Sequence, residues 1–536
     1  MKNHKKASGK KIKSAIICLI ILFCVYLPAA NAESNISTHE IKLIDVIKMT
    51  IEKDSNIRVN KSQQRAAGAG ELSAKAVFDP NLKASVTRSS EYTPLTENQK
   101  KSYSNSGHPD VSKTRQSALS YSVGYEKRFR SGTSISPSLT VSTTESNTPS
   151  GTGPFTNSKI QFSLTKPLAK GNNIKVNTAD EKTSAIESEC SSLDTVHTIS
   201  KAVRDVINSY WSYAYSYKSL KISNDARDRA QKLYDETKML VDNFETPPAE
   251  LDQLKASLFE KEAECEKARQ ALLEAKNSLK TSIGTTDEVF FTNAVPADFF
   301  PIENIINETC EVERLVKELT ISSLKNRNDY IAAMKRLEKY NFSIPAARDS
   351  LRPQVDLQIT AGYSGLKEDK GAAALISSIN NNVPGANVSA VVSYSFNPDK
   401  KSARAELIKI DEQYIQSQIK AEELKRQIGI NIETNVSSVS SIYGRYKRMI
   451  EAIKLYNKAL QNEREKSKMG ASTLIDVVSV EDKLGSAELS LEAAVLEYAT
   501  AVTKLRFEAG CLGKITTSEC EINSKDLLEL PKIGTL

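Results

Sequence analysis

Few residues of this chain have the types and spacing that chemistry requires. Beyond the first thirty-two residues the histidines are His39, His108 and His197, which lie far apart in unrelated contexts. No Ser-His-Asp arrangement, glycine-rich phosphate loop or zinc-ligand spacing occurs. Trp211 stands among several tyrosines, but aromatic residues three and four apart on a helix usually pack against other helices. The sequence therefore predicts no enzyme, no cofactor and no metal site.

The acidic residue that most suggests a function follows a glycine turn, KMGASTLIDVV, at 468–478. Gly470 is suited to end a helix, because glycine reaches the left-handed backbone at little cost. Ser472 or Thr473 can cap the helix that follows, and Asp476 adds negative charge to its first turn. A weaker copy, NFETPPAELDQL, at 243–254 carries Asp252 in the place of Asp476.

Two roles are open for these aspartates. Each aspartate could simply favour a helix N-terminus electrostatically and do nothing more. Alternatively, several copies of the turn meet around an axis, where a ring of carboxylates would constrict a pore and favour cations. The second role requires that the elements around the turns bring several copies together.

Very long helical patterns lead into both turns. Apolar residues three and four apart run from Val203 to Phe244 and again from Leu424 to Leu460, which indicates packing like that of a coiled coil. About seventy residues at roughly 1.5 Å each make a rod on the order of 100 Å. The return helices, at 250–282 and 474–509, are half as long. We therefore expect each long helix to pair with its return helix over one half only.

The other half should pair with a shorter helix that precedes the strands, because the chain is duplicated. Ile57 matches Tyr330 and Pro80 matches Pro353, both at the same offset of 273 residues. In each copy a helix of about twenty residues meets a proline and turns into alternating sequence. This shared order indicates two structural repeats.

The alternating segments predict strands, at 81–167 in the first copy and 354–396 in the second. A soluble sandwich would alternate similarly, but runs of about nine to eleven residues with small polar residues on one face favour a membrane barrel. Most connections are long and polar, whereas Arg130-Ser131-Gly132 predicts a tight turn. The first copy has four strand-like runs and the second has two.

The N-terminus predicts export. Six lysines precede an apolar run from Ala15 to Leu27, and Ala30-Asn31-Ala32 follows, as in a cleaved signal peptide. The chain has 73 basic and 66 acidic residues, so removal of these six lysines leaves 67 against 66. No basic surplus then points to nucleic acid. No later run is apolar enough for a spanning helix, which leaves a β-barrel as the only spanning option.

Five cysteines remain after the signal, an odd number at irregular spacing that predicts no disulfide framework. One local bridge involving Cys310, or joining Cys511 and Cys520, stays open. The predicted organisation is a signal peptide at 1–32, a first repeat at 33–284 with strands 81–167 and a long hairpin 172–283, a link at 285–310, a second repeat at 311–511 with strands 354–396 and a long hairpin 400–510, and a tail at 512–536.

This combination over 38–512 resembles the TolC-like outer membrane efflux family. The resemblance rests on the export signal, the tandem repeats, the Pro80 and Pro353 junctions and the KMGASTLIDVV turn. It implies a mainly α fold with a membrane β-barrel, in which a homotrimer builds an α-barrel across the periplasm and a β-barrel in the outer membrane. It also implies a passive exit duct for efflux or type I secretion, coupled to an inner-membrane transporter through a periplasmic adaptor.

The resemblance assigns roles to the turns. It places Gly470, Ala471, Ser472 and Thr473 at the periplasmic tip that meets the adaptor, together with Thr246, Pro247 and Asp252 of the first copy. Asp476 matches the first of two aspartates that narrow the closed end in some members, and the second position is Ser479 here. In the first copy, a Thr-Pro-Pro sequence replaces the usual glycine turn.

The first copy also has two strands more than the family's repeat. An extracellular hairpin or an enlarged barrel would account for them, and we favour the hairpin, so that a trimer closes at twelve strands. The alternative function is a non-conducting structural coiled-coil protein of the periplasm or cell surface.

Overall fold

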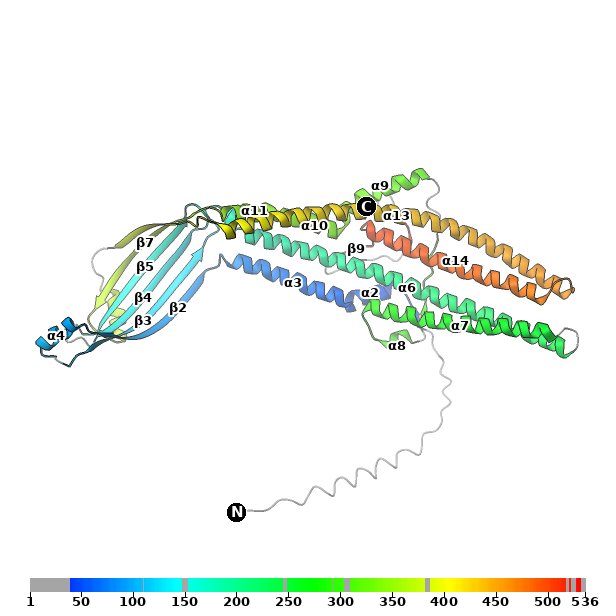
Figure 1. Cartoon of the computed structure of the whole chain (residues 1–536), viewed down its shortest axis with the longest axis horizontal. Helices are drawn as coiled ribbons and strands as arrows, with labels where there is room; N and C mark the ends of the chain where they lie inside the picture. Colours follow the sequence, from blue (N-terminus) through cyan, green and yellow to red (C-terminus); the bar gives the residue numbers. More distant parts are fainter. Residues whose placement is uncertain are drawn as a thin grey trace, which may run out of the picture.

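Long helices occupy one end of the computed structural model and a curved sheet the other (Figure 1). The structure describes residues 39–108, 110–146, 153–243, 248–292, 294–302, 309–380, 386–516, 520–521 and 527–531. The predicted signal peptide, 1–32, lies outside the described residues.

Four helices form two hairpins whose tips lie together at the end farthest from the sheet (Figure 1). Helix α6 (Ala179–Asp242) has 64 residues and α13 (Lys401–Lys468) has 68, so α13 is roughly 100 Å long. The return helices α7 (Pro248–Ile283) and α14 (Leu474–Glu508) have 36 and 35 residues. Each return helix packs along one half of its long helix, as expected. Among the described residues, no helix is both long enough and apolar enough to cross a membrane.

Shorter helices pack against the other halves. In the first repeat α2 (Leu43–Lys53) and α3 (Ser55–Ala76) lie on α6. In the second, α9 (Thr309–Asn326) and α11 (Tyr340–Asp349) lie on α13, and α10 (Asn328–Glu338) contacts both long helices. The span 55–76 of α3 corresponds to 328–349 of α10 and α11 at an offset of 273 residues at both ends, which confirms the duplication.

The repeats share a junction that the sequence patterns did not reveal. Each return helix ends at a glycine with a positive φ, Gly284 (+76°) and Gly510 (+70°). A Cβ on Gly284 would lie 3.0 Å from the Lys53 carbonyl oxygen, and one on Gly510 would lie 3.1 Å from the Asn326 carbonyl carbon. Glycine therefore lets the end of each return helix approach the break between two short helices closely.

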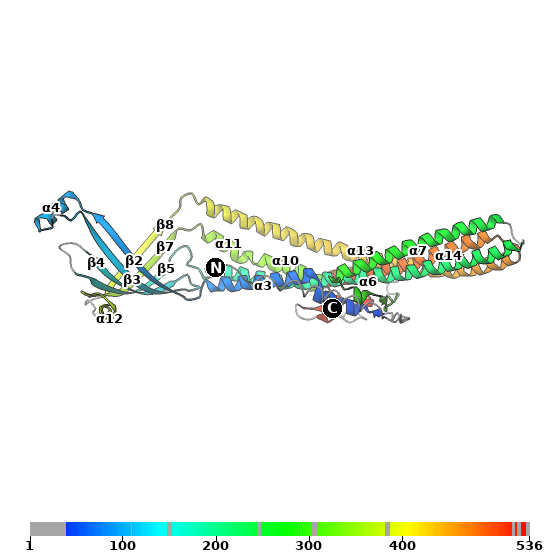
Figure 2. The ribbon, with the colours of Figure 1, turned by 90° about the horizontal axis from the view of Figure 1, so that it is seen from below.

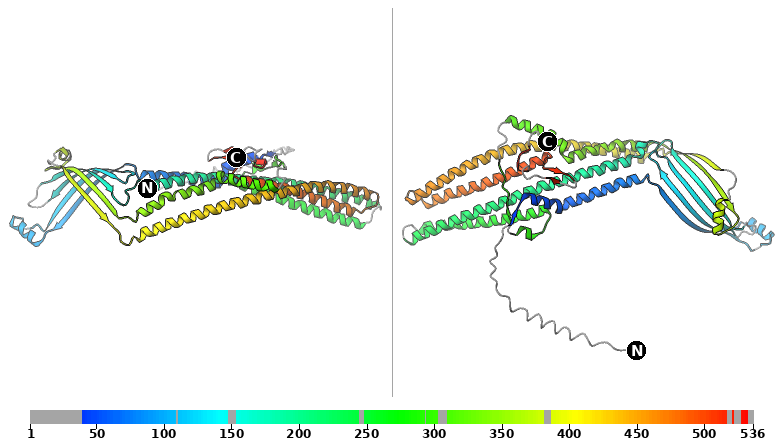
Figure 3. Two further views of the ribbon diagram at one scale, coloured as in Figure 1. Left: turned by 90° about the horizontal axis from the view of Figure 1, so that it is seen from above. Right: turned by 180° about the vertical axis from the view of Figure 1, so that it is seen from behind.

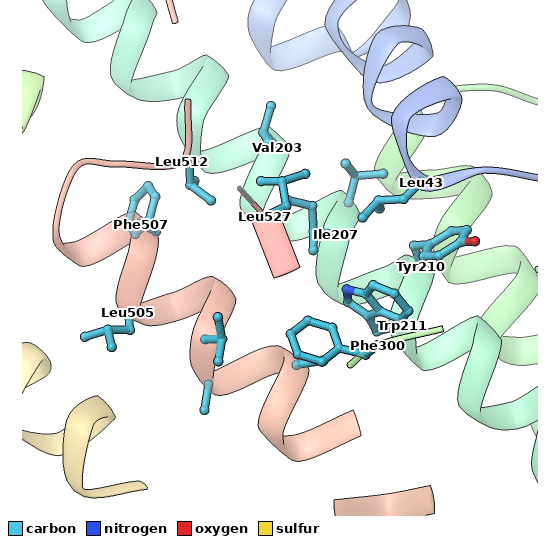
Figure 4. Packing of buried hydrophobic residues seen from close by; sticks show 14 of the residues in the cluster. Leu43, Val203, Ile207, Tyr210, Trp211, Phe300, Leu505, Phe507, Leu512 and Leu527 are labelled. Carbon is cyan, nitrogen blue, oxygen red and sulfur yellow. The ribbon is translucent and has the colours of Figure 1, made fainter. Parts of the chain in front are cut away.

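The apolar core lies around these two junctions, about midway between the sheet and the tips, a level that we call mid-height (Figure 1). Figure 4 shows how its side chains pack. Val203, Ile207 and Trp211 of α6 contribute to it, as do Leu505 and Phe507 of α14. The link and the tail also contribute to this core, through Phe291, Phe300, Leu512, Leu527 and Leu530. Strand β6 (Ala294–Pro296) of the link pairs in parallel with β1 (His39–Ile41). Both segments thus pack around the helices at mid-height.

The remaining short elements are α5 (Ile174–Asn177), α8 (Glu288–Phe291), β9 (Lys514–Ile515) and β10 (Cys520–Glu521). The polar connections at the far end of the sheet contain two helices that the sequence did not predict. These are α4 (Glu97–Asn105), which begins with a Thr96–Gln99 capping box, and α12 (Ala372–Asn380).

The strands within 81–167 and 354–396 all join one antiparallel sheet, in the order β2-β3-β4-β5-β7-β8. Their bounds are β2 (Asn81–Pro94), β3 (Lys113–Arg128), β4 (Ser134–Ser146), β5 (Phe155–Pro167), β7 (Gln354–Lys367) and β8 (Asn387–Ser395). The sheet is curved, and α12 lies on its convex side (Figure 2). Seen from behind, the strands lie side by side from β2 to β8 (Figure 3).

The two faces of this sheet differ in chemistry. Residues that stand opposite one another in the register share a face. One face is apolar across all six strands, with Leu82, Val86, Tyr121, Val123, Leu139, Val141, Ile160, Phe162, Ile359, Tyr363, Val388 and Val392. The other carries mostly small polar residues, including Ser85, Ser122, Ser138, Gln161, Thr360 and Ser389. Ser158, which stands opposite Val141 on the apolar face, donates its hydroxyl to Ser378 O of α12 at 2.8 Å, so the apolar face is the convex one.

The prediction that the two extra strands of the first repeat form an extracellular hairpin is wrong. The two strands that the first repeat has in excess, β3 and β4, are inserted between β2 and β5, and each is paired along its length. The pairing satisfies their backbone groups within the sheet, which a detached hairpin could not do on its outer edges. One subunit therefore contributes six strands to the sheet rather than four.

The turn between β3 and β4 is anchored to the helical part. Gly132 has φ +85°, and a Cβ there would overlap the carbonyl oxygen of Gly171. Arg130 Nε and one Nη lie 2.8 Å from the two carboxylate oxygens of Glu181 at the start of α6. The tight turn predicted at Arg130-Ser131-Gly132 is confirmed, and its position fixes the inserted hairpin at the end of the sheet that meets the helices.

Candidate functional site

The tip of the second hairpin is ordered by its own backbone. Gly470 has φ +69° and ends α13. Its N–H donates to Ser467 O at 3.0 Å, and the N–H of Ala471 donates to Lys466 O at 2.9 Å. This pair of hydrogen bonds is a Schellman motif, which satisfies the last carbonyls of the helix. The glycine turn predicted from the sequence is confirmed.

A capping box begins the return helix. Thr473 Oγ1 accepts a hydrogen bond from the Asp476 N–H at 3.2 Å, and Asp476 Oδ2 accepts one from the Thr473 N–H at 3.1 Å. Of the two caps that the sequence allowed, the backbone uses Thr473. Hydrogen bonds from the Thr473 hydroxyl and N–H lower the pKa of the Asp476 carboxyl below its usual range. Asp476 is therefore both a helix-end residue and an ionised, exposed carboxylate.

Ser472 and Ser479 lie on either side of this cap. Ser472 donates its hydroxyl to Glu463, a residue of α13 that the sequence analysis did not single out. Hydrogen bonds from Ser472 and Lys466 lower the pKa of Glu463. Ser479 is exposed one turn beyond Asp476. Glu463 and Asp476 thus place two carboxylates at one tip. The spacing of residues along the chain gave no signal for Glu463, because only the turn brings the return helix next to it.

The first tip is described only in part. Thr246 and Pro247 lie outside the described residues. Asp252 is exposed and is the fifth residue of α7, whereas Asp476 is the third residue of α14. The third residue of α7 is Glu250, which occupies its first turn. The structure therefore does not place Asp252 in the helical position that Asp476 holds.

Ion pairs link the two hairpins above the tips. Arg229 Nε of α6 lies 2.6 Å from Glu481 Oε1 of α14, and Lys261 Nζ of α7 lies 2.9 Å from Asp482 Oδ1. Burial disfavours the charged form of Lys261, but hydrogen bonds to Asp482 and Glu264 outweigh it and raise its pKa. The partners are more than two hundred residues apart along the chain, so the sequence carried no sign of these contacts.

Known proteins resemble this architecture in structure but not in sequence. No family model and no curated protein matches the sequence. The outer-membrane channel OprN is similar over 87% of this chain and 89% of its own, with a TM-score of 0.64 and 15% identity. The CmeC outer membrane channel of Campylobacter jejuni covers 89% of this chain and 87% of its own, with a TM-score of 0.64 and 12% identity. The open-state MtrE outer membrane channel of Neisseria gonorrhoeae has a TM-score of 0.61, 15% identity and coverages of 87% and 88%.

The chain has the fold of these outer-membrane channels. The resemblance to the TolC-like family is thus confirmed at the level of the fold, as is the mainly α architecture with a sheet region. These neighbours are channel proteins rather than enzymes.

Other chemistry-bearing groups within this channel fold are structural. Tyr210 and Tyr213 are buried in the core and donate their hydroxyls to the carbonyls of Ile41 (3.0 Å) and Ala294 (2.6 Å). The aromatic group around Trp211 is therefore packing, as expected. Among the described residues, no cluster of histidine, cysteine and acidic side chains could hold a metal ion.

The cysteines whose side chains are described are free thiols. Cys511 forms no disulfide, so the bridge considered with Cys520 is absent. Burial raises the pKa of both Cys190 and Cys511 to about 11, which keeps these thiols protonated and unreactive. Both cysteines therefore pack as small apolar residues.

Proposed function

We propose that three copies of this chain form a passive exit duct in the outer membrane. The sheets would join into one β-barrel in the lipid, and the helices would form a hollow α-barrel across the periplasm. The duct would receive its cargo from an inner-membrane transporter through a periplasmic adaptor, for efflux or type I secretion.

The observation that carries this proposal is the convex face of the sheet. Large apolar side chains stand on it in all six strands, and in every strand except β4 some of them are exposed, among them Leu82 (71% exposed), Phe162 and Val388. An exposed apolar surface of this extent marks a contact with a membrane or a partner. The concave face carries small polar residues, as expected for a water-filled lumen. The channel fold supports the same conclusion.

The tips are the proposed inner mouth of the duct. Gly470, Ala471, Ser472 and Thr473 would meet the adaptor, together with Thr246, Pro247 and Asp252 of the first hairpin. Around a threefold axis, three Asp476 carboxylates would form a cation-attracting constriction, with Ser479 next to it. The lowered pKa of Asp476 supports this role, because the group keeps its charge near neutral pH.

Fractionation and conductance test the duct. The purified protein should come from the outer-membrane fraction, run as a heat-modifiable trimer in SDS and conduct ions in planar bilayers. Extraction without detergent, with no trimer and no conductance, would instead identify the non-conducting coiled-coil alternative. Crosslinking in cells followed by purification would identify the adaptor and the transporter.

A matched pair of variants tests the constriction. Asp476→Ala should weaken cation preference or enlarge the closed-state conductance. Asp476→Asn keeps an oxygen for the Thr473 cap and removes only the charge, so it should change ion preference without loosening the turn. Unchanged ion preference in both variants would limit Asp476 to its role at the helix end.

A further inference from the structure

The two outer strands of the sheet have free edges. Within the part of the chain that the structure describes, β2 pairs with β3 alone and β8 with β7 alone. All 14 residues of β2 and all nine of β8 are exposed. A long, exposed strand edge presents backbone groups that another strand can satisfy. In lipid such an edge cannot stay open, because no water is there to bond it.

The free edges match each other in direction. Five successive antiparallel pairings separate β2 from β8, so these two strands run in opposite directions. β8 of one copy can therefore pair antiparallel with β2 of the next. The apolar face continues across such a seam, because Leu82 and Val86 on β2 and Val388 and Val392 on β8 belong to the same face. An odd number of strands would have failed this condition.

The helices next to the sheet also form a row with two uncovered ends. Between the sheet and mid-height they form a row in which α3 contacts α6, α10 contacts α6 and α13, and α11 contacts α13. The row therefore begins with α3 and ends with α13. Ile408, Ile415 and Ile419 are exposed on α13, seven and four residues apart and hence on one stripe, and Leu72 is exposed on α3. A head-to-tail contact between copies would cover both ends of the row and of the sheet together.

We propose that β8 of each copy pairs with β2 of the next, so that the trimer closes a barrel of eighteen strands instead of twelve. This inference rests on the proposed trimeric duct and states how its barrel is built. Three six-stranded sheets supply the strands. Because diameter grows roughly linearly with strand number, the barrel is about one and a half times as wide as a twelve-stranded one, in the range that leaves an aqueous channel.

The anchored turn explains why β3 and β4 stay in the barrel. Their turn is held between Glu181 and Gly171 at the base of the sheet. A twelve-stranded barrel would have to release this turn and bring β2 against β5. Removing the hairpin from the sheet would break the complete ladders on both of its sides.

Engineered cysteine pairs test the seam and the strand number separately. The background replaces the five cysteines of the mature chain by alanine and must still form the trimer. Ser85→Cys is combined in turn with cysteine at each position of β8 whose side chain shares the polar face with Ser85: Asn387, Ser389, Val391, Ser393 and Ser395. At least one combination should link copies, giving covalent dimers and trimers on a non-reducing gel.

Two pairs within one subunit test the insertion. Ser85→Cys with Ser122→Cys spans the β2–β3 contact, where the two hydroxyls lie 2.8 Å apart, and should form a disulfide in the assembled protein. Ser85→Cys with Ser163→Cys would span β2 and β5, and should form none while β3 and β4 lie between them. Peptide mass spectrometry of the isolated trimer distinguishes the two.

The outcomes separate the two levels of the proposal. A Ser85–Ser163 disulfide in the trimer would overturn the eighteen-stranded barrel and leave the duct intact. Trimers without any β2–β8 link at the five positions would overturn the seam. Absence of trimers from the outer membrane, before any cysteine is introduced, would reject the duct itself.

Discussion

In the first repeat α3 leads into four strands, and in the second α11 leads into two. The helical parts differ far less: 64 and 68 residues in the long helices, and 36 and 35 in the return helices. An antiparallel sheet accepts a further hairpin without changing where the chain enters or leaves, because two strands reverse direction twice. A helical barrel has no such freedom, since every helix must keep its stripe and its length to meet its neighbours. The duplicated chain therefore varies at the sheet and is constrained in the helices.

The junctions at mid-height differ in chemistry rather than in geometry. Asp54 in the first repeat caps α3 by accepting a 2.8 Å hydrogen bond from the Ile57 N–H. Arg327 holds the equivalent position in the second repeat and is buried. It bonds Asp329 at 2.6 Å and also pairs with Glu508 at the end of α14. The same close approach of glycine to a helix break is thus stabilised by a cap in one repeat and by a buried ion-pair network in the other.

The largest expected effect comes from this difference. Arg327→Ala should destabilise the protein by about 3–5 kcal/mol, because it leaves Asp329 and Glu508 partly buried without their cation. Asp54→Ala should cost about 1 kcal/mol, the usual value for a lost cap. Thermal unfolding of the detergent-solubilised protein, followed by circular dichroism, compares them.

Arg426→Ala is the matched control for Arg327→Ala, because Arg426 also pairs with a carboxylate (Glu423, 2.6 Å), but both side chains of this pair are exposed. It should change the free energy of unfolding by less than about 1 kcal/mol. Equal losses in Arg327→Ala and Asp54→Ala would mean that the two junctions are energetically alike.

The next effect concerns the inserted hairpin. Gly132→Ala and Gly171→Ala both force alanine into a left-handed backbone, at roughly 1–2 kcal/mol each. Only the Cβ of the first overlaps a backbone oxygen, whereas the second meets nothing closer than 3.7 Å. Gly132→Ala should therefore lower the yield of SDS-resistant trimer clearly more than Gly171→Ala. Equal yields would show that the turn is not a fixed part of the sheet.

A smaller effect is expected at the second tip. Thr473→Ala should cost about 1 kcal/mol, because the first turn of α14 loses its cap. The loss should be local, so hydrogen exchange should speed up for the amides at 474–477 and stay unchanged at mid-height. Ser479→Ala serves as a control at an exposed position outside the cap. Equally slow exchange in the Thr473 variant would show that the Schellman turn alone holds the tip.

The smallest effect is a dependence on pH where the repeats meet. His197 of α6 lies 3.7 Å from Asp329 of α10. Burial lowers the pKa of His197, and the nearby charge of Arg327 and Arg204 acts in the same direction against the attraction of Asp329 and Asp194. Below the ordinary histidine value of about 6.5 the unfolded chain therefore binds a proton that the folded chain resists. Stability should fall as pH drops through this range.

His197→Gln should flatten that slope between pH 7 and 5.5, as measured by the melting temperature. The Asp329 carboxyl contributes in a separate window. Burial raises its pKa, but the Arg327 hydrogen bond and the neighbouring charges outweigh burial and lower it overall. Its stabilisation is therefore present above the ordinary aspartate value and is lost only as pH falls below it. A slope that persists unchanged in His197→Gln would place the pH dependence elsewhere.

The helical part was predictable from sequence because its signals are local. Stripes of apolar residues, a glycine with a positive φ at 470 and a cap at Thr473 act within a few residues of one another, and the offset of 273 relates the repeats directly. The strands were also visible, because alternation is a local pattern. The sequence could not tell whether Asp476 caps a helix or lines a pore, and the structure of one subunit establishes the cap.

The sequence by itself determined the order of the strands and of the long and return helices, the lengths of those helices and the duplication, since each depends on neighbouring residues. The tertiary structure alone decided which strands are neighbours. The sequences of β3 and β4 are compatible both with strands inside the sheet and with a detached hairpin. Only the hydrogen-bond ladders to β2 and β5 and the Arg130–Glu181 contact show that these strands lie inside the sheet. The Arg229–Glu481 and Lys261–Asp482 pairs are of the same kind. Contacts between residues hundreds of positions apart leave no periodic trace in one chain, because nothing local requires them.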